Sequence, residues 1–321
     1  MSTILWPPPP AEEILEREKE ATTRRELEWL VAAAQETLQS LKAGLEECAA
    51  LLAPREFGST LVLSSQRSES LKGFVTLNGT RIVKGDVQLR LASLPPPRGQ
   101  PAYRLAVSSS ATAPTLVIDQ LVSARTLINA CLDVVDATIW TGDGTSAAYM
   151  STQFRLLAEN VAEARQALKG GHEHAKSWTE DPIDKTTFEP HLPSSLSLHF
   201  HVAEAGLVLA VRTLEVVHDG TSTGTSTPTS SYAQTYSGLS IRNRLAVALG
   251  AVQTPQHDEA DEIFSHRGQQ VRVKEKLRIE TQDPSLMAAL AKLSALEHTV
   301  AVMRRALDVV MGVEHSEDND D

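Results

Sequence analysis

Four stretches of the chain repeat apolar residues at intervals of three and four, the spacing that places side chains on one stripe of a helix. The clearest stripe lies in the middle of the chain and consists of Met150, Phe154, Leu157, Val161, Ala164 and Leu168. Two others lie near the ends, over residues 11–52 and 284–313, and a fourth covers residues 119–140. A single apolar stripe has to be buried against another element. We therefore expect the N-terminal, central and C-terminal helices to form one antiparallel bundle.

Between these stretches the apolar period changes to two, which is typical of β-strands with one buried face. The alternating segments are residues 71–77, 87–91, 103–107, 196–202, 207–211 and 271–279. Asn78-Gly79 follows the first segment and is a strong signal for a hairpin turn. Glu204-Ala205-Gly206 separates the members of a second hairpin. These patterns predict antiparallel strands with one solvent-exposed face.

The predicted fold class is therefore α+β, with an antiparallel helical bundle and a separate antiparallel β domain. Both domains are expected to be discontinuous in sequence. The bundle would contain residues 11–56, 115–170 and 284–313, and the β domain residues 57–114 and 188–283. Three segments are expected to be disordered because of their composition: the proline-rich residues 1–10, the Ser/Thr-rich residues 219–237 and the acidic residues 314–321.

Composition narrows the possible partners of the chain. The 321 residues carry a formal charge of −11, which argues against nucleic acid and anionic membrane surfaces as partners. No signal peptide is expected, and no segment is expected to insert into a membrane. Cys48 and Cys131 both fall on apolar sides of predicted helices, so a disulfide framework is excluded and a cytoplasmic location is expected.

Two His-x-His pairs raise the possibility of a metal-dependent enzyme. His199 and His201 lie two apart in a predicted strand, so both could reach one ion, and His172 and His174 form the other pair. A zinc site needs three or four ligands, and neither cysteine is near either pair. Leu198 and its apolar neighbours occupy the buried face of the strand, so we expect the histidines to face water. No metal or cofactor is predicted, and the His199/His201 site stays as an alternative.

Other signals for chemistry are weak. The loop Gly142-Asp143-Gly144-Thr145 joins two predicted helices without the preceding strand and lysine of a phosphate-binding loop. No serine lies in a Gly-x-Ser-x-Gly elbow, and no catalytic residue is predicted. The leucine stripes have two interpretations, a zipper that forms a homodimer or the core of a bundle within one chain. Their fourfold recurrence favours the bundle.

The order of the segments resembles a known family. An early helix reads Arg25-Glu26-Leu27-Glu28-Trp29-Leu30, and a strand and turn follow at residues 71–79, Leu-Lys-Gly-Phe-Val-Thr-Leu-Asn-Gly. Leu192-Pro193-Ser194-Ser195-Leu196 leads into the second hairpin, and a Val-Lys-Glu strand near Val273 leads into the last leucine-rich helix. In this order the chain resembles the Rogdi family, whose fungal members are the second subunit of the RAVE complex.

The resemblance implies a non-enzymatic role without cofactors. The expected function is that of an adaptor that promotes reassembly of the soluble sector of the V-ATPase with its membrane sector, and hence acidification of vacuoles and endosomes. The expected partners are the β-propeller scaffold subunit of RAVE and, through the complex, soluble-sector subunits of the ATPase. The expected location is cytoplasmic, with peripheral recruitment to vacuolar and endosomal membranes.

Overall fold

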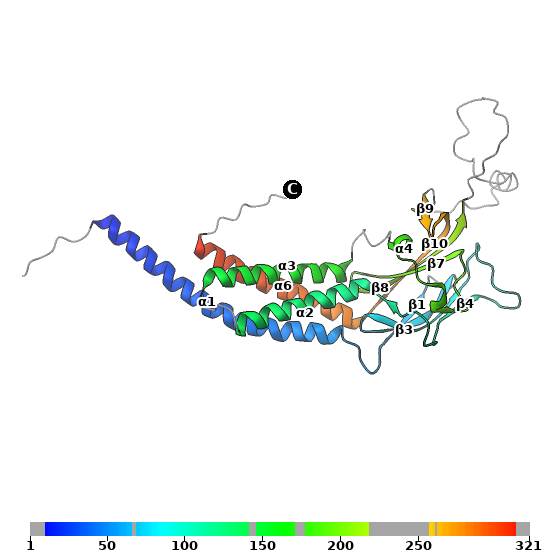
Figure 1. Ribbon diagram of the computed structural model, residues 1–321, viewed down its shortest axis with the longest axis horizontal. Coiled ribbons are helices and arrows are strands. Elements are labelled where there is room, and N and C mark those ends of the chain that lie inside the picture. The colour runs from blue at the N-terminus through cyan, green and yellow to red at the C-terminus, as the bar shows by residue number, and fades with distance from the viewer. Residues whose placement is uncertain are drawn as a thin grey trace, which may run out of the picture.

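The computed structural model describes residues 10–65, 69–140, 146–170, 177–217, 257–260 and 262–312. Within these ranges, four long helices form an elongated bundle, and two antiparallel sheets lie together at one end of it (Figure 1). The α+β fold class is thereby confirmed. Of the segments predicted to be disordered, residues 1–9, 219–237 and 314–321 lie outside the described residues. The loop 141–145 and the pair His172 and His174 lie outside them as well.

The bundle contains α1 (Ala11–Leu51), α2 (Asp119–Trp140), α3 (Ala147–Lys169) and α6 (Pro284–Met311). Consecutive helices run in opposite directions, and each packs against its two neighbours in the order α1, α2, α3, α6 (Figure 1). The predicted stripes are the residues that become buried. In α3 they are Met150, Phe154, Leu157, Val161, Ala164 and Leu168. Segments that are far apart in sequence therefore share one aliphatic core.

Local signals define the ends of these helices. The Ser146 side chain accepts a hydrogen bond from the backbone N–H of Tyr149 and caps the start of α3. Asp283 caps α6 in the same way, and Pro284 occupies the first position of that helix, where its missing N–H is not needed. Gly312 ends α6 in the left-handed conformation that glycine adopts without strain.

The first sheet has the strand order β1-β2-β3-β4-β6, with β5 also paired to β3. Its strands are β1 (Ser59–Ser64), β2 (Leu71–Asn78), β3 (Arg81–Leu89), β4 (Tyr103–Val107), β5 (Leu116–Val117) and β6 (Phe188–Glu189). The predicted Asn78-Gly79 turn joins β2 to β3, with Gly79 at φ 61°. Leucine, valine and isoleucine side chains cover the inner face of this sheet, and the exposed outer face carries polar and some apolar side chains.

The second sheet has the order β7-β8-β10-β9. Its strands are β7 (Leu196–Ala203), β8 (Gly206–Val216), β9 (Ile263–His266) and β10 (Gln269–Gln282). The short helix α4 (Ser177–Glu180) and the 3-10 turn η3 (Lys185–Thr187) precede β6 in the chain. The predicted turn of the second hairpin is confirmed, with positive φ at Glu204 and Ala205.

This turn connects the second sheet to the bundle. The backbone N–H groups of Glu204 and Ala205 donate to the carbonyl groups of Lys169 and Leu168 at 2.7 and 2.9 Å. The last carbonyls of a helix have no partner within the helix, so the strained turn supplies the donors that α3 needs. Only glycine fits next to this contact, because a Cβ at Gly170 would lie 2.4 Å from the Val202 carbonyl oxygen.

A second connection lies at the start of α2. The buried Gln120 side chain donates to the Val202 carbonyl at 2.9 Å and accepts from the Val202 N–H at 2.6 Å. The amide thereby pairs with the backbone of β7, which is an edge strand of its sheet. One continuous set of buried apolar residues runs from the bundle into both sheets. The domain boundaries proposed from sequence remain a prediction.

Two expectations need correction. The sequence pattern does not predict β1, β5, β6 or β9, which are short strands, some of them without clear alternation of apolar and polar residues. No membrane-crossing segment is expected from the sequence either, whereas α6 is long and apolar enough to cross a membrane by length and composition. This is weak evidence for a membrane span, because α6 packs along α1 and α3 as part of the bundle.

Candidate functional site

The histidine pair of β7 does not form a recognisable metal site. His199 and His201 stack with their ring centroids 5.2 Å apart, and both are half-buried. The expectation that they face water is therefore only partly right, because the neighbouring strand contributes the buried Val208 and Ala210 opposite them. Among the described residues, no group of three or more His, Cys, Asp or Glu side chains could hold a metal ion.

Both cysteines lie inside the helical core. Cys48 of α1 and Cys131 of α2 are free thiols and fully buried. Burial raises the pKa of Cys48 to about 11 and the pKa of Cys131 to about 12. A thiolate is the reactive form of cysteine, so neither side chain is suited to act as a nucleophile or a metal ligand.

A buried ionic cluster lies on the second sheet, on the face away from the first sheet. Arg212 of β8 donates from Nε to Glu259 at 2.6 Å and from Nη2 to the same carboxylate at 2.8 Å. Lys276 of β10 donates to Glu259 at 2.7 Å and to Asp258 at 2.7 Å. Burial opposes ionisation of Glu259, but the hydrogen bonds from Arg212 and Lys276 outweigh it, so the pKa of Glu259 is lowered.

Aromatic rings cover this cluster. The Arg212 guanidinium lies 4.7 Å from the centre of the Trp178 ring, an arrangement that favours a cation–π contact. Trp178 also packs against Phe264 and His266, with centroid distances of 5.1 and 5.4 Å. Burial lowers the pKa of His266, and the charge of Arg267 lowers it further. The cluster connects α4 and β9 to the sheet.

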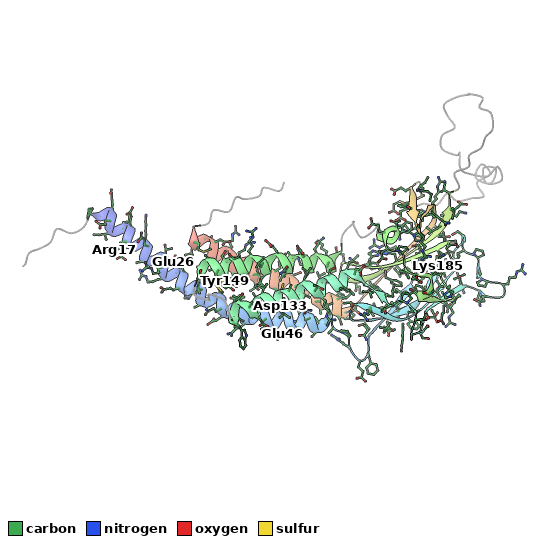
Figure 2. The ribbon with its side chains drawn as sticks, in the orientation of Figure 1. Arg17, Glu26, Glu46, Asp133, Tyr149 and Lys185 are labelled. Carbon is green, nitrogen blue, oxygen red and sulfur yellow. The ribbon has the colours of Figure 1, made fainter. Side chains whose placement is uncertain are left out.

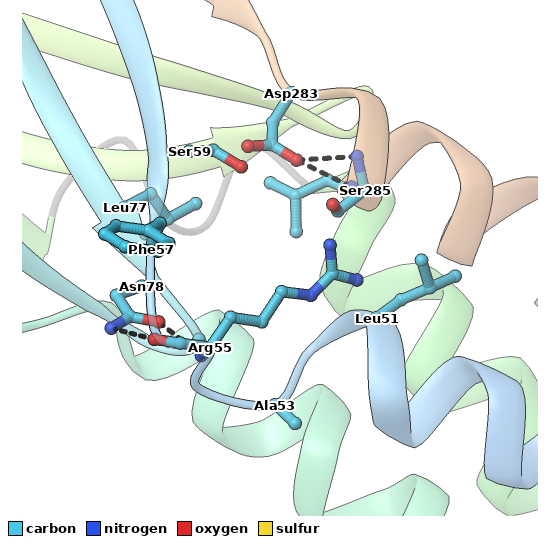
Figure 3. Close-up of a pocket in the computed structure, with 12 residues that line it drawn as sticks. Leu51, Ala53, Arg55, Phe57, Ser59, Leu77, Asn78, Asp283 and Ser285 are labelled. Carbon is cyan, nitrogen blue, oxygen red and sulfur yellow. Dashed lines mark hydrogen bonds between the residues drawn. The ribbon is translucent and has the colours of Figure 1, made fainter.

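A small pocket lies where the bundle meets the first sheet (Figure 3). On one wall of this pocket, Asp283 Oδ1 accepts hydrogen bonds from the backbone N–H groups of Ser285 and Leu286 at 2.7 and 3.0 Å. Its Oδ2 is buried without a hydrogen-bond partner among the described residues. Asn78 holds the Arg55 backbone through two hydrogen bonds on the opposite wall. The cavity volume of about 20 Å³ is enough for roughly one water molecule.

The N-terminal part of α1 extends beyond the bundle. Every residue from 11 to 29 is exposed or half-buried, and at 1.5 Å per residue this stretch is about 28 Å long. Figure 2 shows Arg17 on the extending part and Glu26 closer to the bundle. An open groove of about 630 Å³ lies where α1 leaves the other helices, lined mainly by α1 and by Ala147 of α3. The walls carry charges of both signs, including Lys19, Glu20 and Arg24.

The leucine stripes pack against other helices of the same chain. Leu38, Leu41 and Leu45 of α1 are almost fully buried by the other helices of the bundle. They are therefore not available for a zipper between two chains. Among the described residues, buried polar groups such as the Gln120 amide connect one element to another.

Comparison with known proteins gives one family. A sequence model described as "Rogdi leucine zipper containing protein" matches residues 26–308. The match covers the bundle and both sheets, but most of the extending part of α1 precedes it. No curated protein matches the chain.

Proposed function

This chain belongs to the Rogdi leucine zipper family, and from that membership we propose that it is a non-enzymatic adaptor in the RAVE complex. In this role it promotes reassembly of the soluble sector of the V-ATPase with its membrane sector. The family match over residues 26–308 is the observation that carries the proposal, and it supports a protein-interaction role most directly.

The architecture is consistent with an adaptor. An adaptor has to hold two or more surfaces in a fixed relation. Here the hydrogen bonds from the β7–β8 turn to the end of α3, and from Gln120 to β7, connect the bundle to the second sheet. Different partners could therefore bind at the two ends of one elongated body. The proposed partners are the β-propeller scaffold subunit and, through it, the soluble-sector subunits.

The proposed location follows from the same reasoning. A chain with a charge of −11 is repelled by anionic lipid surfaces, so peripheral recruitment from the cytoplasm to vacuolar and endosomal membranes would depend on protein partners.

A binding experiment with purified components tests the adaptor role. The tagged full chain is immobilised and offered the scaffold subunit, the isolated soluble sector, or both. We expect capture of the scaffold alone, and capture of the soluble sector that is strongest when the scaffold is present. If the scaffold is not retained above the level of a tag-only surface, the adaptor proposal is wrong.

A further inference from the structure

The first sheet and its loops carry a charge opposite to that of the whole protein. Residues 52–118 contain eight Lys and Arg and three Asp and Glu, a net charge of +5 in a chain of net charge −11. These cations are not consecutive in sequence. The strand register brings several of them onto the outer face of the sheet, which no described helix covers (Figure 1).

Exposed apolar side chains lie on this outer face, on β1, β2, β3 and β5. Val62 of β1 is directly opposite Phe74 of β2, and their exposed fractions are 69% and 41%. Val83 of β3 and Val117 of β5 are also exposed, at 44% and 39%. Residues of this kind at the centre of a face with a polar border are typical of protein interfaces.

Two lysines border the apolar centre. Lys72 precedes Phe74 by two positions on β2 and therefore shares its face, and Lys84 is paired with Thr76, the next residue on that face. Both are exposed, and neither forms an ion pair with a described residue. By contrast, the nearby Arg104 is neutralised by Asp86, to which its Nε donates at 3.0 Å. Lys72 and Lys84 are thus two cations of this face that remain available.

We propose that this outer face, centred on Val62 and Phe74 and bordered by Lys72 and Lys84, docks an acidic polypeptide segment of a partner protein. The segment would carry aliphatic side chains among its carboxylates, so that it covers the apolar centre and pairs with both lysines. The inference rests on the proposed adaptor function and assigns the chemistry of one partner. The overall negative charge does not prevent such docking, because charges farther than about 10 Å are largely screened at physiological salt.

Charge and distance argue against two other segments of this chain, and against an anionic membrane, as the occupant of this face. Residues 218–256 contain a single acidic residue, Asp219, and two arginines, so this segment of the chain does not complement a basic face. The acidic residues 313–321 begin at the far end of α6, about 42 Å from the sheets along that helix, and nine extended residues span at most about 32 Å. An anionic membrane would gain only about 1 kcal/mol for each lysine near its surface, too little for stable binding through two lysines.

A fluorescence anisotropy titration of the full chain tests the proposal. The probe is a fluorescein-labelled 12-residue peptide of alternating Glu and Val, and the control peptide has Lys in place of each Glu. We expect the acidic probe to bind with an affinity that falls as salt is raised, and the basic peptide not to bind. The double variant Lys72→Glu/Lys84→Glu should weaken binding at least roughly tenfold, and Phe74→Ala should weaken it severalfold.

The matched control is Arg17→Glu/Lys19→Glu, which makes the same change of net charge on the exposed part of α1. It should bind the acidic probe like the wild type, and the two charge-reversal variants should keep the wild-type melting temperature because their positions are exposed. Failure of the wild type to bind the acidic probe overturns the proposal, as does an equal loss of affinity in the α1 control. Binding to phosphatidylserine vesicles that needs Lys72 and Lys84, without peptide binding, would identify a membrane as the occupant instead.

The same variants separate this inference from the proposed function. If the acidic probe binds through Lys72 and Lys84 but the scaffold and soluble sector do not bind the chain, the docking face stands and the adaptor proposal fails. If the scaffold is captured equally by the wild type and by Lys72→Glu/Lys84→Glu, and the probe does not bind, only the docking face is overturned.

Discussion

A set of paired polar residues lies around Trp178 on the second sheet. Arg212 and Lys276 both donate hydrogen bonds to Glu259, and the aromatic ring of Trp178 lies against the Arg212 guanidinium. His266 lies next to the same ring, and the charges of Arg267 and Lys185 that act on it are positive. The paired charges of the cluster are therefore stable in this buried place, whereas the protonated, positively charged form of His266 is disfavoured.

Protonation of His266 should destabilise the fold in mild acid. Its pKa is lowered in the folded protein, chiefly by burial, so as the pH falls below about 6.5 the unfolded chain binds a proton more readily than the folded chain. The free energy of unfolding should then fall with falling pH, by up to about 1.4 kcal/mol per pH unit from this residue. Urea denaturation at a series of pH values measures this slope.

His266→Gln should reduce the slope in that pH range, whatever it does to stability at pH 8. The control is His298→Gln, a change at an exposed position of α6, which should leave the slope as in the wild type. An unchanged slope in His266→Gln would show that this histidine is not buried as described.

At the scale of elements, the stability of each helix depends mainly on its buried apolar stripe and less on its exposed side chains. In α3, Leu157 is 1% exposed and its neighbour Leu156 is 41% exposed. Removing the buried side chain should leave a cavity in the bundle, whereas removing the exposed one should not. Leu157→Ala should therefore cost roughly 2–5 kcal/mol of unfolding free energy, and Leu156→Ala less than about 1 kcal/mol. Equal effects in thermal or urea denaturation would contradict the assignment of the buried face.

The cap of α6 permits a similar comparison. Asp283 accepts two backbone hydrogen bonds through Oδ1, and Oδ2 has no partner among the described residues. Asp283→Ala should lower the free energy of unfolding by about 0.5–2 kcal/mol through loss of the cap. Asp283→Asn keeps an acceptor and should retain most of that stability. If the two variants are equally destabilised, the negative charge and not the capping geometry is what matters.

The four long helices could be predicted almost completely from sequence because each repeats its apolar period over several turns. The bounds of α2 were predicted as residues 119–140 and are found there. The missed strands are short, and β5 and β6 have two residues each, too few for a period to be recognised. They form because longer strands beside them offer backbone partners, which is information from the tertiary structure.

The basic face of the first sheet could not be predicted for a related reason. Lys72 and Lys84 are twelve positions apart, and each looks like an isolated solvent-facing charge. Only the register of β2 and β3, including the shift after Thr76, places both beside Phe74. A search for consecutive Lys and Arg residues in the sequence therefore does not detect such a surface.

At the scale of the whole molecule, the leucine stripes that could have formed a zipper are buried within a single chain. We expect the purified protein to be a monomer of 34.8 kDa at micromolar concentration, measured by light scattering coupled to size-exclusion chromatography. A mass that doubles with concentration would mean that an exposed face, such as the outer surface of α6, mediates self-association.

The elongated shape gives the protein two distant ends with different chemistry. One end is the part of α1 that extends beyond the bundle, with mixed charges, and the other is the pair of sheets with the basic face (Figure 1). Such a shape suits a protein that connects partners over a distance. It is consistent with the adaptor role that the family membership supports.

The most direct test of this role is the fraction of V-ATPase soluble-sector subunits that sediments with vacuolar membranes after reversible disassembly. In cells that lack this chain, we expect this fraction to stay low and vacuolar acidification to be impaired, with both restored by the wild-type chain. Normal sedimentation of the soluble sector in cells without the chain would contradict the account.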